Sequence, residues 1–167
     1  MFRRTVTAVA VALLLVACAK NAKSPLPVDK ASDAATVVLN FNAAADLNPG
    51  ARGQAAPVRI RIFELKNTPS FSRADYFALA ERSQSTLGVD LVDQDEVLLQ
   101  PGQQLTLERP LNEATRQIGL VAGFRDIDHA QWRALLSITQ HQTSEFRIGV
   151  DARTLHSEAI HSVRPAQ

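Results

Sequence analysis

The residue type best suited to chemistry in this chain is its one cysteine, Cys18, among 167 residues. An almost wholly apolar run, residues 6–16, precedes it, and Arg3 and Arg4 precede the run. Positive charge, a short apolar stretch and then small residues are the order found in secretory signals. The run is shorter than the about 20 residues that a membrane-spanning helix needs. We therefore predict an export signal over residues 1–17.

The four residues that end this segment, Leu15–Cys18, resemble the lipobox of bacterial lipoproteins, whose cysteine thiol is acylated before the signal is cut. This resemblance implies that Cys18 begins the mature chain and carries a covalent lipid; no other cofactor is expected. Several acyl chains, at about 0.8 kcal/mol per buried methylene, anchor a protein firmly. In Gram-negative lipoproteins an aspartate after the cysteine favours the inner membrane, so Ala19 implies the outer membrane, facing the periplasm. The alternative is an ordinary signal peptide with an incidental cysteine.

Other side chains that bind metal ions do not form a ligand pattern. No second cysteine or tight acidic cluster accompanies the histidines. The acidic run Asp93, Asp95 and Glu96 lacks the glycine and terminal glutamate of a calcium loop, so we expect a solvated turn before a strand. No metal site is predicted. The four histidines considered are His129, His141, His156 and His161.

Catalysis and nucleic-acid binding are also disfavoured. Asp126, Asp128 and His129 lie close in sequence, but the chain has no G-x-S-x-G elbow, no G-x-G-x-x-G motif and no phosphate loop. We expect the two aspartates to cap a helical turn that leads to a buried Trp132. Aromatic residues are 5% of the chain and no basic stripe interleaves with them. The sequence predicts no enzyme, no nucleic-acid partner and no small-molecule substrate.

Short β runs follow from residue 36 onward. In residues 58–62, valine and isoleucine alternate with Arg59 and Arg61, which is typical of a half-buried strand, and we place Glu64 and Lys66 on the same polar face as the arginines. About seven such strands with turns between them predict an antiparallel β-sandwich. The other expected strands are residues 36–45, 97–99, 104–107, 117–124, 134–139 and 145–150.

One segment, residues 72–83, has helical rather than β periodicity. Ser72 is the expected N-cap, and Asp75 lies in a first turn that favours negative charge. At helical spacing, Tyr76 and Phe77 are expected to pack on the sheet. We therefore predict a helix of about three turns here.

The composition indicates a tether followed by one domain. Residues 18–35 mix lysine, serine, proline and alanine, which predicts a flexible tether. Residues 36–167 form the expected sandwich domain. The mature chain has no second cysteine for a disulfide, and 46% hydrophobic residues are enough for one packed core. Its near-neutral charge gives no indication of a polyanionic partner.

Five stretches, in the same order, resemble the TssJ (SciN) family of outer-membrane lipoproteins in bacterial type VI secretion. The resemblance implies a mainly β, transthyretin-like antiparallel β-sandwich with one or two short helical additions. It also implies a structural role in an envelope-spanning complex with TssL and TssM, with direct binding to the periplasmic C-terminal domain of TssM. The stretches are the lipobox and residues 47–66, 71–81, 87–103 and 118–133.

The same resemblance implies that the loop between the first two strands carries the contact with TssM. Its turn-forming residues and its length, greater than a hairpin needs, agree with a functional loop on a rigid scaffold. We expect Arg52 at its tip as the main contact, because arginine is enriched at interface hot spots. Leu47 could either plug the core or touch a partner. The loop comprises Asp46, Leu47, Asn48, Pro49, Gly50, Ala51, Arg52, Gly53, Gln54, Ala55, Ala56 and Pro57.

The alternative function, from another class, is a periplasmic ligand-binding or carrier lipoprotein with a β-sandwich. Such a protein needs a sizeable apolar pocket with converging polar groups. No group of this kind is evident in the sequence.

Overall fold

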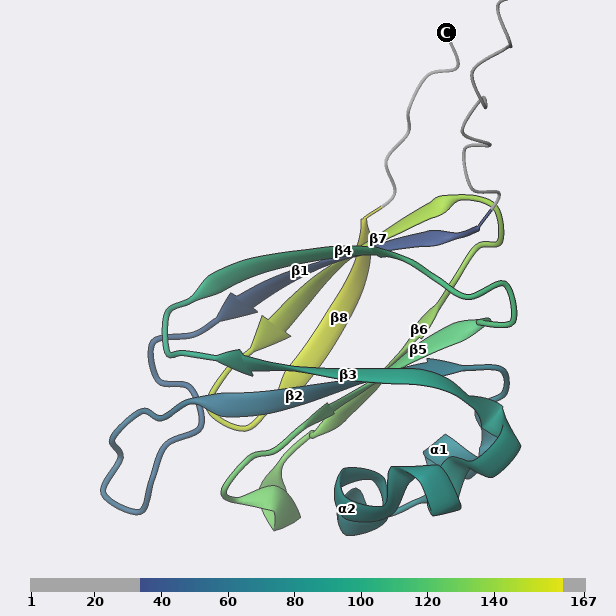
Figure 1. Ribbon diagram of the computed structural model, residues 1–167. Helices are drawn as coiled ribbons and strands as arrows, with labels where there is room; N and C mark the ends of the chain where they lie inside the picture. Colours follow the sequence, from purple (N-terminus) through teal and green to yellow (C-terminus); the bar gives the residue numbers. More distant parts are fainter. Residues whose placement is uncertain (1–33, 161–167) are drawn as a thin grey trace, which may run out of the picture. The chain divides into compact units, whose positions relative to one another are not determined.

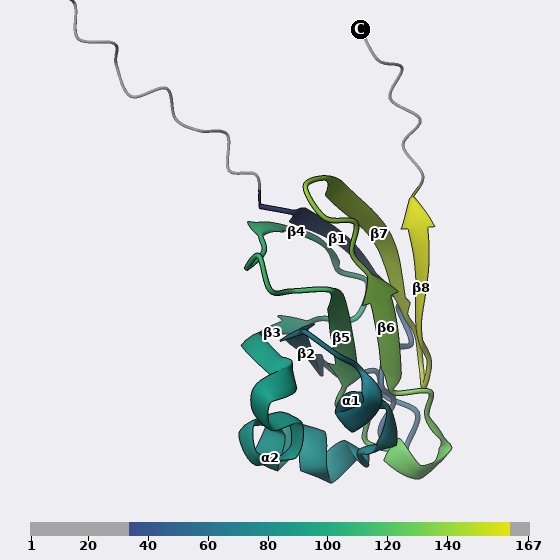
Figure 2. The ribbon, with the colours of Figure 1, turned by 90° about the vertical axis from the view of Figure 1, so that its right-hand side faces the viewer.

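In the computed structural model, which describes residues 34–160, two four-stranded sheets face each other and helices cover part of one outer face (Figures 1 and 2). The predicted mainly β sandwich is confirmed. The strands of the first sheet, in spatial order, are β4 (Gln104–Pro110), β1 (Thr36–Ala43), β7 (Thr143–Val150) and β8 (Leu155–Ile160). Those of the second are β3 (Leu91–Leu99), β2 (Val58–Leu65), β5 (Gln117–Ala122) and β6 (Arg133–Ser137).

The pairings are antiparallel except for one. Strands β1 and β7 run parallel, with Leu39 opposite Phe146. The chain between these two strands contains the whole second sheet and β4 rather than a hairpin turn, so local turn chemistry does not dictate their direction. The first sheet is therefore mixed, a departure from the all-antiparallel expectation.

Alternation along the strands places the core between the sheets. In β1 the buried side chains include Leu39 and Phe41, and in β2 they include Ile60 and Ile62, as the periodicity predicts. Beyond Ile62 both faces of β2 are buried, because the helices cover its outer face.

The predicted helix is two helices, α1 (Pro69–Arg73) and α2 (Tyr76–Leu87), separated by the extended residue Ala74. Ser72 lies inside α1, so the expectation that it is an N-cap is wrong. Asp75 is the N-cap of α2, and its Oδ1 accepts a hydrogen bond from the Ala78 amide at 2.8 Å. Local spacing indicated helical periodicity but missed the break, which lets α1 turn onto the sheet.

The helices are seated on the second sheet by one close approach. Phe71 of α1 is fully buried, and its ring carbons lie 2.7 Å from where a Cβ on Gly119 of β5 would stand. Only glycine leaves room there, since real Cβ contacts are longer. The ring of Phe71 also contacts Phe63 of β2, with centroids 5.9 Å apart.

The two aromatic side chains at the start of α2 differ in burial. Tyr76 is half-buried and its ring meets Trp132 edge-on, with centroids 5.6 Å apart. Phe77 is 54% exposed, so the expectation that it packs on the sheet is wrong. Trp132 is half-buried rather than fully buried, and it contacts both apolar clusters.

The acidic run expected to form a turn lies within β3, which begins six residues before the predicted strand. Asp93 and Asp95 point toward Arg109 of β4 in the opposite sheet, with oxygen-to-nitrogen distances of 3.2 and 3.1 Å. Glu96 faces the other way, toward the arginines of β2. Ion pairing across the edge of the sandwich explains why this charged segment is a strand.

Glu64 is only 2% exposed, so its assignment to the polar face of β2 is wrong. It follows Ile62 on the inner face, where its Oε1 accepts a hydrogen bond from Arg109 Nη2. Its Oε2 accepts bonds from Thr115 Oγ1 at 2.6 Å and the Asn112 amide at 3.2 Å. The pattern of alternation did place this residue inward; its charge was misleading.

The other edge of the sandwich is joined by backbone hydrogen bonds. The amide of Gln131 donates to the Arg153 carbonyl at 2.9 Å, and the Leu155 amide donates to the Gln131 carbonyl at 2.8 Å. Short 3₁₀ turns lie at Gly88–Asp90 and Ile127–His129, the second within the predicted helical turn. Within residues 34–160, no helix is long and apolar enough to cross a membrane. The expected signal, lipobox and most of the tether lie outside the described residues.

Candidate partner-binding end of the sandwich

The loop between β1 and β2 is anchored by Leu47, whose side chain is fully buried in the sandwich core. Its amide donates to the Ala44 carbonyl at 3.2 Å, and its carbonyl accepts from the Ala56 amide at 2.9 Å. Leu47 therefore fills the end of the core, which is one of the two roles that the sequence left open. The loop is thereby closed at its base like a short hairpin.

Asn48 ties this loop to a second one. It is 3% exposed and has a φ of 45°, in the left-handed region that asparagine tolerates better than most residues. Its Nδ2 donates to the Pro57 carbonyl at 2.8 Å, and its Oδ1 accepts from the Arg125 amide at 2.8 Å. Asn48 is therefore a positioning residue rather than a contact for a partner.

The tip of the loop is held by two backbone hydrogen bonds. The Gly50 amide donates to the Gln54 carbonyl at 2.9 Å, and the Gly53 amide donates to the Gly50 carbonyl at 2.8 Å. Gly53 has a φ of 79°, which suits glycine. Residues 51–55 are exposed. Within residues 34–160, Arg52 has neither a hydrogen bond nor an ion pair through its guanidinium, so the loop presents an uncompensated cation.

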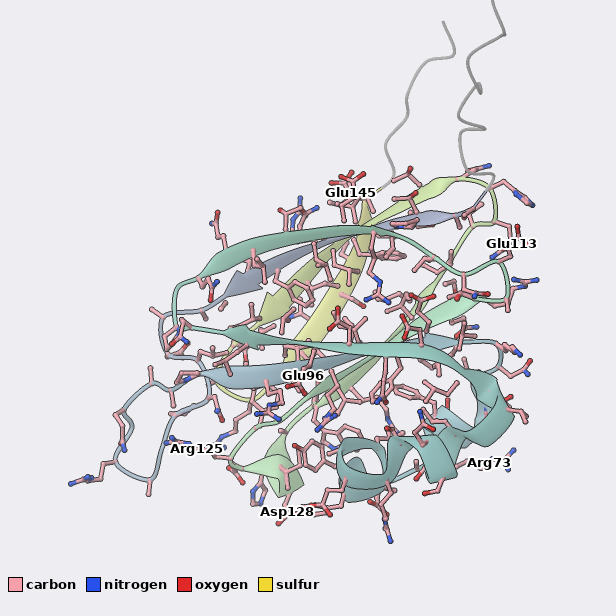
Figure 3. The ribbon with its side chains drawn as sticks, viewed as in Figure 1. Arg73, Glu96, Glu113, Arg125, Asp128 and Glu145 are labelled. Carbon is pink, nitrogen blue, oxygen red and sulfur yellow. The ribbon has the colours of Figure 1, made fainter. Side chains whose placement is uncertain are left out.

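Three connections meet at this end and enclose a solvent-open hollow of about 650 Å³. They are the β1–β2 loop, the segment after β5 with Arg125, and the β7–β8 turn with Arg153. Figure 3 shows Arg125 at this end of the sandwich and Arg73 at the other. A Cβ on Gly50 would lie 2.7 Å from Arg125 Nη1, so the loop and this side chain are in close contact.

A charged network lines one side of the hollow. Asp126 pairs with His129 Nδ1 at 2.7 Å and with Arg153 Nε at 3.2 Å. The hydrogen bond to Asp126 raises the pKa of His129, and the same bond lowers the pKa of Asp126. Asp126 makes no side-chain capping bond to the 3₁₀ turn, so its expected capping role is wrong. Its carboxylate instead ties two of the three connections together.

The chemistry of this end suits recognition of a protein surface. The hollow is lined by charged, polar and small residues, whereas carrier pockets are lined mainly by apolar and aromatic ones. In residues 34–160 no group of three histidine, cysteine, aspartate or glutamate side chains could hold a metal ion. Arg52 and Arg125 instead offer planar cations that can pair bidentately with carboxylates.

Sequence reasoning placed the β1–β2 loop here but missed Arg125, Ala152 and Arg153. These residues lie about 75 to 105 positions further along the chain, and no motif marks them. The only usable signal was topological: strands that run parallel, as β1 and β7 do, end at the same edge of the sheet. That pairing could not be derived from local patterns.

The model of the type VI secretion lipoprotein family, which groups VasD, EvfM and TssJ, matches residues 35–153. The chain belongs to this family. The family resemblance inferred from five sequence stretches is thus confirmed.

Solved structures agree with this membership. TssJ1, the type VI secretion lipoprotein of Pseudomonas aeruginosa, is 49% identical, with a TM-score of 0.73 over 80% of this chain and 99% of that one. Lip of Serratia marcescens, a membrane-bound component of the type VI secretion system, is 28% identical, with a TM-score of 0.68 over 74% of this chain and 96% of that one. A comparison with curated proteins gives no significant match.

A third similar chain comes from the structure described as the type VI secretion protein TssM C-terminal domain from EAEC. It is 30% identical to this protein, with a TM-score of 0.62, over 75% of this chain and 98% of that one. Family, fold and secretion system therefore agree across these structures.

Proposed function

We propose that this type VI secretion lipoprotein is a non-enzymatic scaffold of the envelope-spanning membrane complex. A lipid on Cys18 anchors it in the outer membrane, facing the periplasm, and the β1–β2 loop binds the periplasmic C-terminal domain of TssM. TssL is the further member of that complex. Family membership and the similarity to a chain from the TssM structure support this assignment.

The observation that carries the proposal is the preorganised loop. Buried Leu47 and the two hydrogen bonds of Asn48 hold its base, and the backbone bonds of Gly50 and Gly53 hold its tip. A loop that is already ordered loses little conformational entropy when it binds. Arg52 then meets a partner with its guanidinium free of competing partners within the described chain.

Anchoring complements this contact. A partner that reaches across the periplasm from the other membrane meets a loop confined near the bilayer. Confinement raises the effective concentration of the two surfaces and strengthens a modest contact without adding new ones. A lipid anchor and an exposed loop therefore act together as a bridge.

The test is a charge reversal at the tip, Arg52→Glu, in the mature full-length chain. We expect affinity for the purified TssM periplasmic domain to fall by at most about 2 kcal/mol, roughly 30-fold, which is the scale of an interface hot spot. Isothermal titration calorimetry measures the change. Asn48 is left intact, because removing its side chain would also lower stability and so confuse a loss of binding with a loss of folding.

The matched control is Arg73→Glu, at the opposite end of the sandwich (Figure 3). It makes the same change of charge on an exposed residue, and its affinity should equal that of the unaltered chain. Equal affinity for all three proteins, or equal losses in both variants, would remove the loop tip from the binding site.

A further inference from the structure

Two large apolar side chains stand exposed on this side of the molecule, one on the outer face of the second sheet and one on the helix that partly covers it. Leu98 of β3 is 56% exposed and Phe77 at the start of α2 is 54% exposed. The helices cover this face only over the half of β2 that contains Phe63 and Leu65. The half nearest the β1–β2 loop is left open, as Figure 1 shows by the position of α1 and α2.

Register and contacts place these side chains on one continuous surface. Leu98 is the cross-strand partner of Arg59, and the Gly123 amide donates to the Arg59 carbonyl at 2.8 Å. Tyr76 lies over Gly123, with its hydroxyl 2.9 Å from where a Cβ would stand. The ring of Phe77 meets that of Tyr76 edge-on, with centroids 5.3 Å apart. We call this the β2–β3 surface: Arg59, Arg61, Tyr76, Phe77, Glu96 and Leu98.

The β2–β3 surface carries more positive than negative charge. Arg59 Nη1 lies 3.6 Å from Glu96 Oε1, and Arg61 Nη1 lies 3.7 Å from Glu96 Oε2. Two guanidinium groups thus share one carboxylate, at distances longer than a hydrogen bond. The Arg59–Glu96 pair is exposed on both sides, and exposed pairs of this kind are weak and can be exchanged for new partners. An incoming carboxylate would complete the charge balance between the two arginines.

This surface continues directly into the proposed TssM-binding loop. Strand β2 begins at Val58, immediately after the loop, and Ala55 and Pro57 are exposed on the way. On the other side Arg125, also exposed, adjoins both Gly50 and the strand end beyond Gly123. Arg59 and Leu98 therefore lie directly beyond the end of the loop, on the strand that the loop enters and on its neighbour.

We infer that the β2–β3 surface binds a second segment of the same protein that the loop binds, one with a carboxylate flanked by apolar side chains. The carboxylate pairs with Arg59 and Arg61, and the apolar groups cover Leu98 and Phe77. This inference rests on the proposed function. A second copy of this chain fits less well, because a symmetric contact would bring the same excess of arginine to both sides.

The test compares two double variants of the mature full-length chain, with the purified TssM periplasmic domain as the probe. Leu98→Ser with Arg59→Ser removes one apolar and one cationic group from the surface. Val89→Ser with Arg73→Ser makes the same changes elsewhere, and Val89 is 86% exposed. We expect the first pair to weaken binding by about tenfold or more and the second to leave it unchanged. The affinity of the Leu98→Ser/Arg59→Ser variant should also depend less on salt concentration than that of the unaltered chain, because a charge contact is lost.

Thermal unfolding and sedimentation accompany the titrations. Both double variants should unfold close to the temperature of the unaltered chain, since all four side chains are exposed. If Leu98→Ser with Arg59→Ser binds normally while Arg52→Glu binds weakly, this inference fails and the proposed function stands. If neither this double variant nor Arg52→Glu weakens binding, this inference and the proposed function both fail. If the first pair instead abolishes a dimer and leaves TssM binding intact, the surface belongs to copies of this chain and the inference is wrong.

Discussion

At the scale of single residues, Arg109 is the clearest example of one side chain joining two layers. From β4 in the first sheet it reaches Glu64, Asp93 and Asp95 in the second. Glu64 is satisfied on its other oxygen by Thr115 and Asn112. A buried carboxylate is tolerated only when it is paired and hydrogen-bonded in this way. The three ion pairs of Arg109 thus join β4 to β2 and β3 at this edge of the sandwich.

Removing the cation should be costly. We expect Arg109→Met to lower the free energy of unfolding by about 3 to 5 kcal/mol, because it leaves Glu64 buried without a counter-charge. Arg147→Met is the matched control, since Arg147 pairs with Glu158 on the surface and both side chains are exposed. It should cost at most about 1 kcal/mol. Urea unfolding measures both, and similar losses would show that the buried pair is not the stabilising one.

At the scale of elements, the β1–β2 loop behaves as part of the scaffold at its base and as a free surface at its tip. Leu47 belongs to the core, and Asn48 connects the loop to the segment after β5. Residues 51–55 are exposed. This division explains how a long loop can present Arg52 in a defined position without being covered itself.

Asn48→Ala tests whether the base of the loop fixes the position of its tip. It removes both side-chain hydrogen bonds and places alanine at a positive φ, so we expect about 2 to 3 kcal/mol of lost stability. Affinity for TssM should fall as well, because the tip loses its fixed position. Asn48→Asp keeps the acceptor for the Arg125 amide and loses the donor to Pro57, so its loss should be intermediate. Thermal unfolding as high as that of the unaltered chain would contradict this account of the loop.

At the scale of the whole molecule, the described residues 34–160 form one packed unit. Its core lies between the two sheets, and both edges are bridged, by Arg109 on one side and by the Gln131 backbone on the other. Membrane attachment is therefore expected to be separable from folding.

Cys18→Ser tests that separation. We expect the variant to lose palmitate labelling and to leave the outer-membrane fraction, because no thiol remains to be acylated, while the domain unfolds at an unchanged temperature. Ala19→Asp is the companion variant; it keeps the lipid and should move the protein to the inner-membrane fraction. Outer-membrane fractionation of the Cys18→Ser variant would show that the lipid is not the anchor.

Patterns of alternation were a good guide wherever a strand has one buried face. Residues 58–62 show this: the sheet has a period of two, so neighbouring side chains must face opposite sides. Side-chain character was the misleading guide at two positions, the charge of Glu64 and the apolar ring of Phe77. Glu64 is inside because Arg109, 45 positions away, neutralises it. Phe77 is outside because α2 buries the face that carries Leu79 and Leu87, and a residue two positions before Leu79 lies on nearly the opposite face of the helix.

Local sequence was thus sufficient for the kind of fold, because alternation along a strand depends on near neighbours in the chain. The export signal and the partner-binding role of the loop stay predictions. Only folding decides that Arg125 and Arg153 stand beside that loop, that β1 and β7 run parallel, and that Leu98 stays uncovered. These features depend on groups tens of residues apart, whose meeting is set by packing of the two sheets rather than by any local pattern.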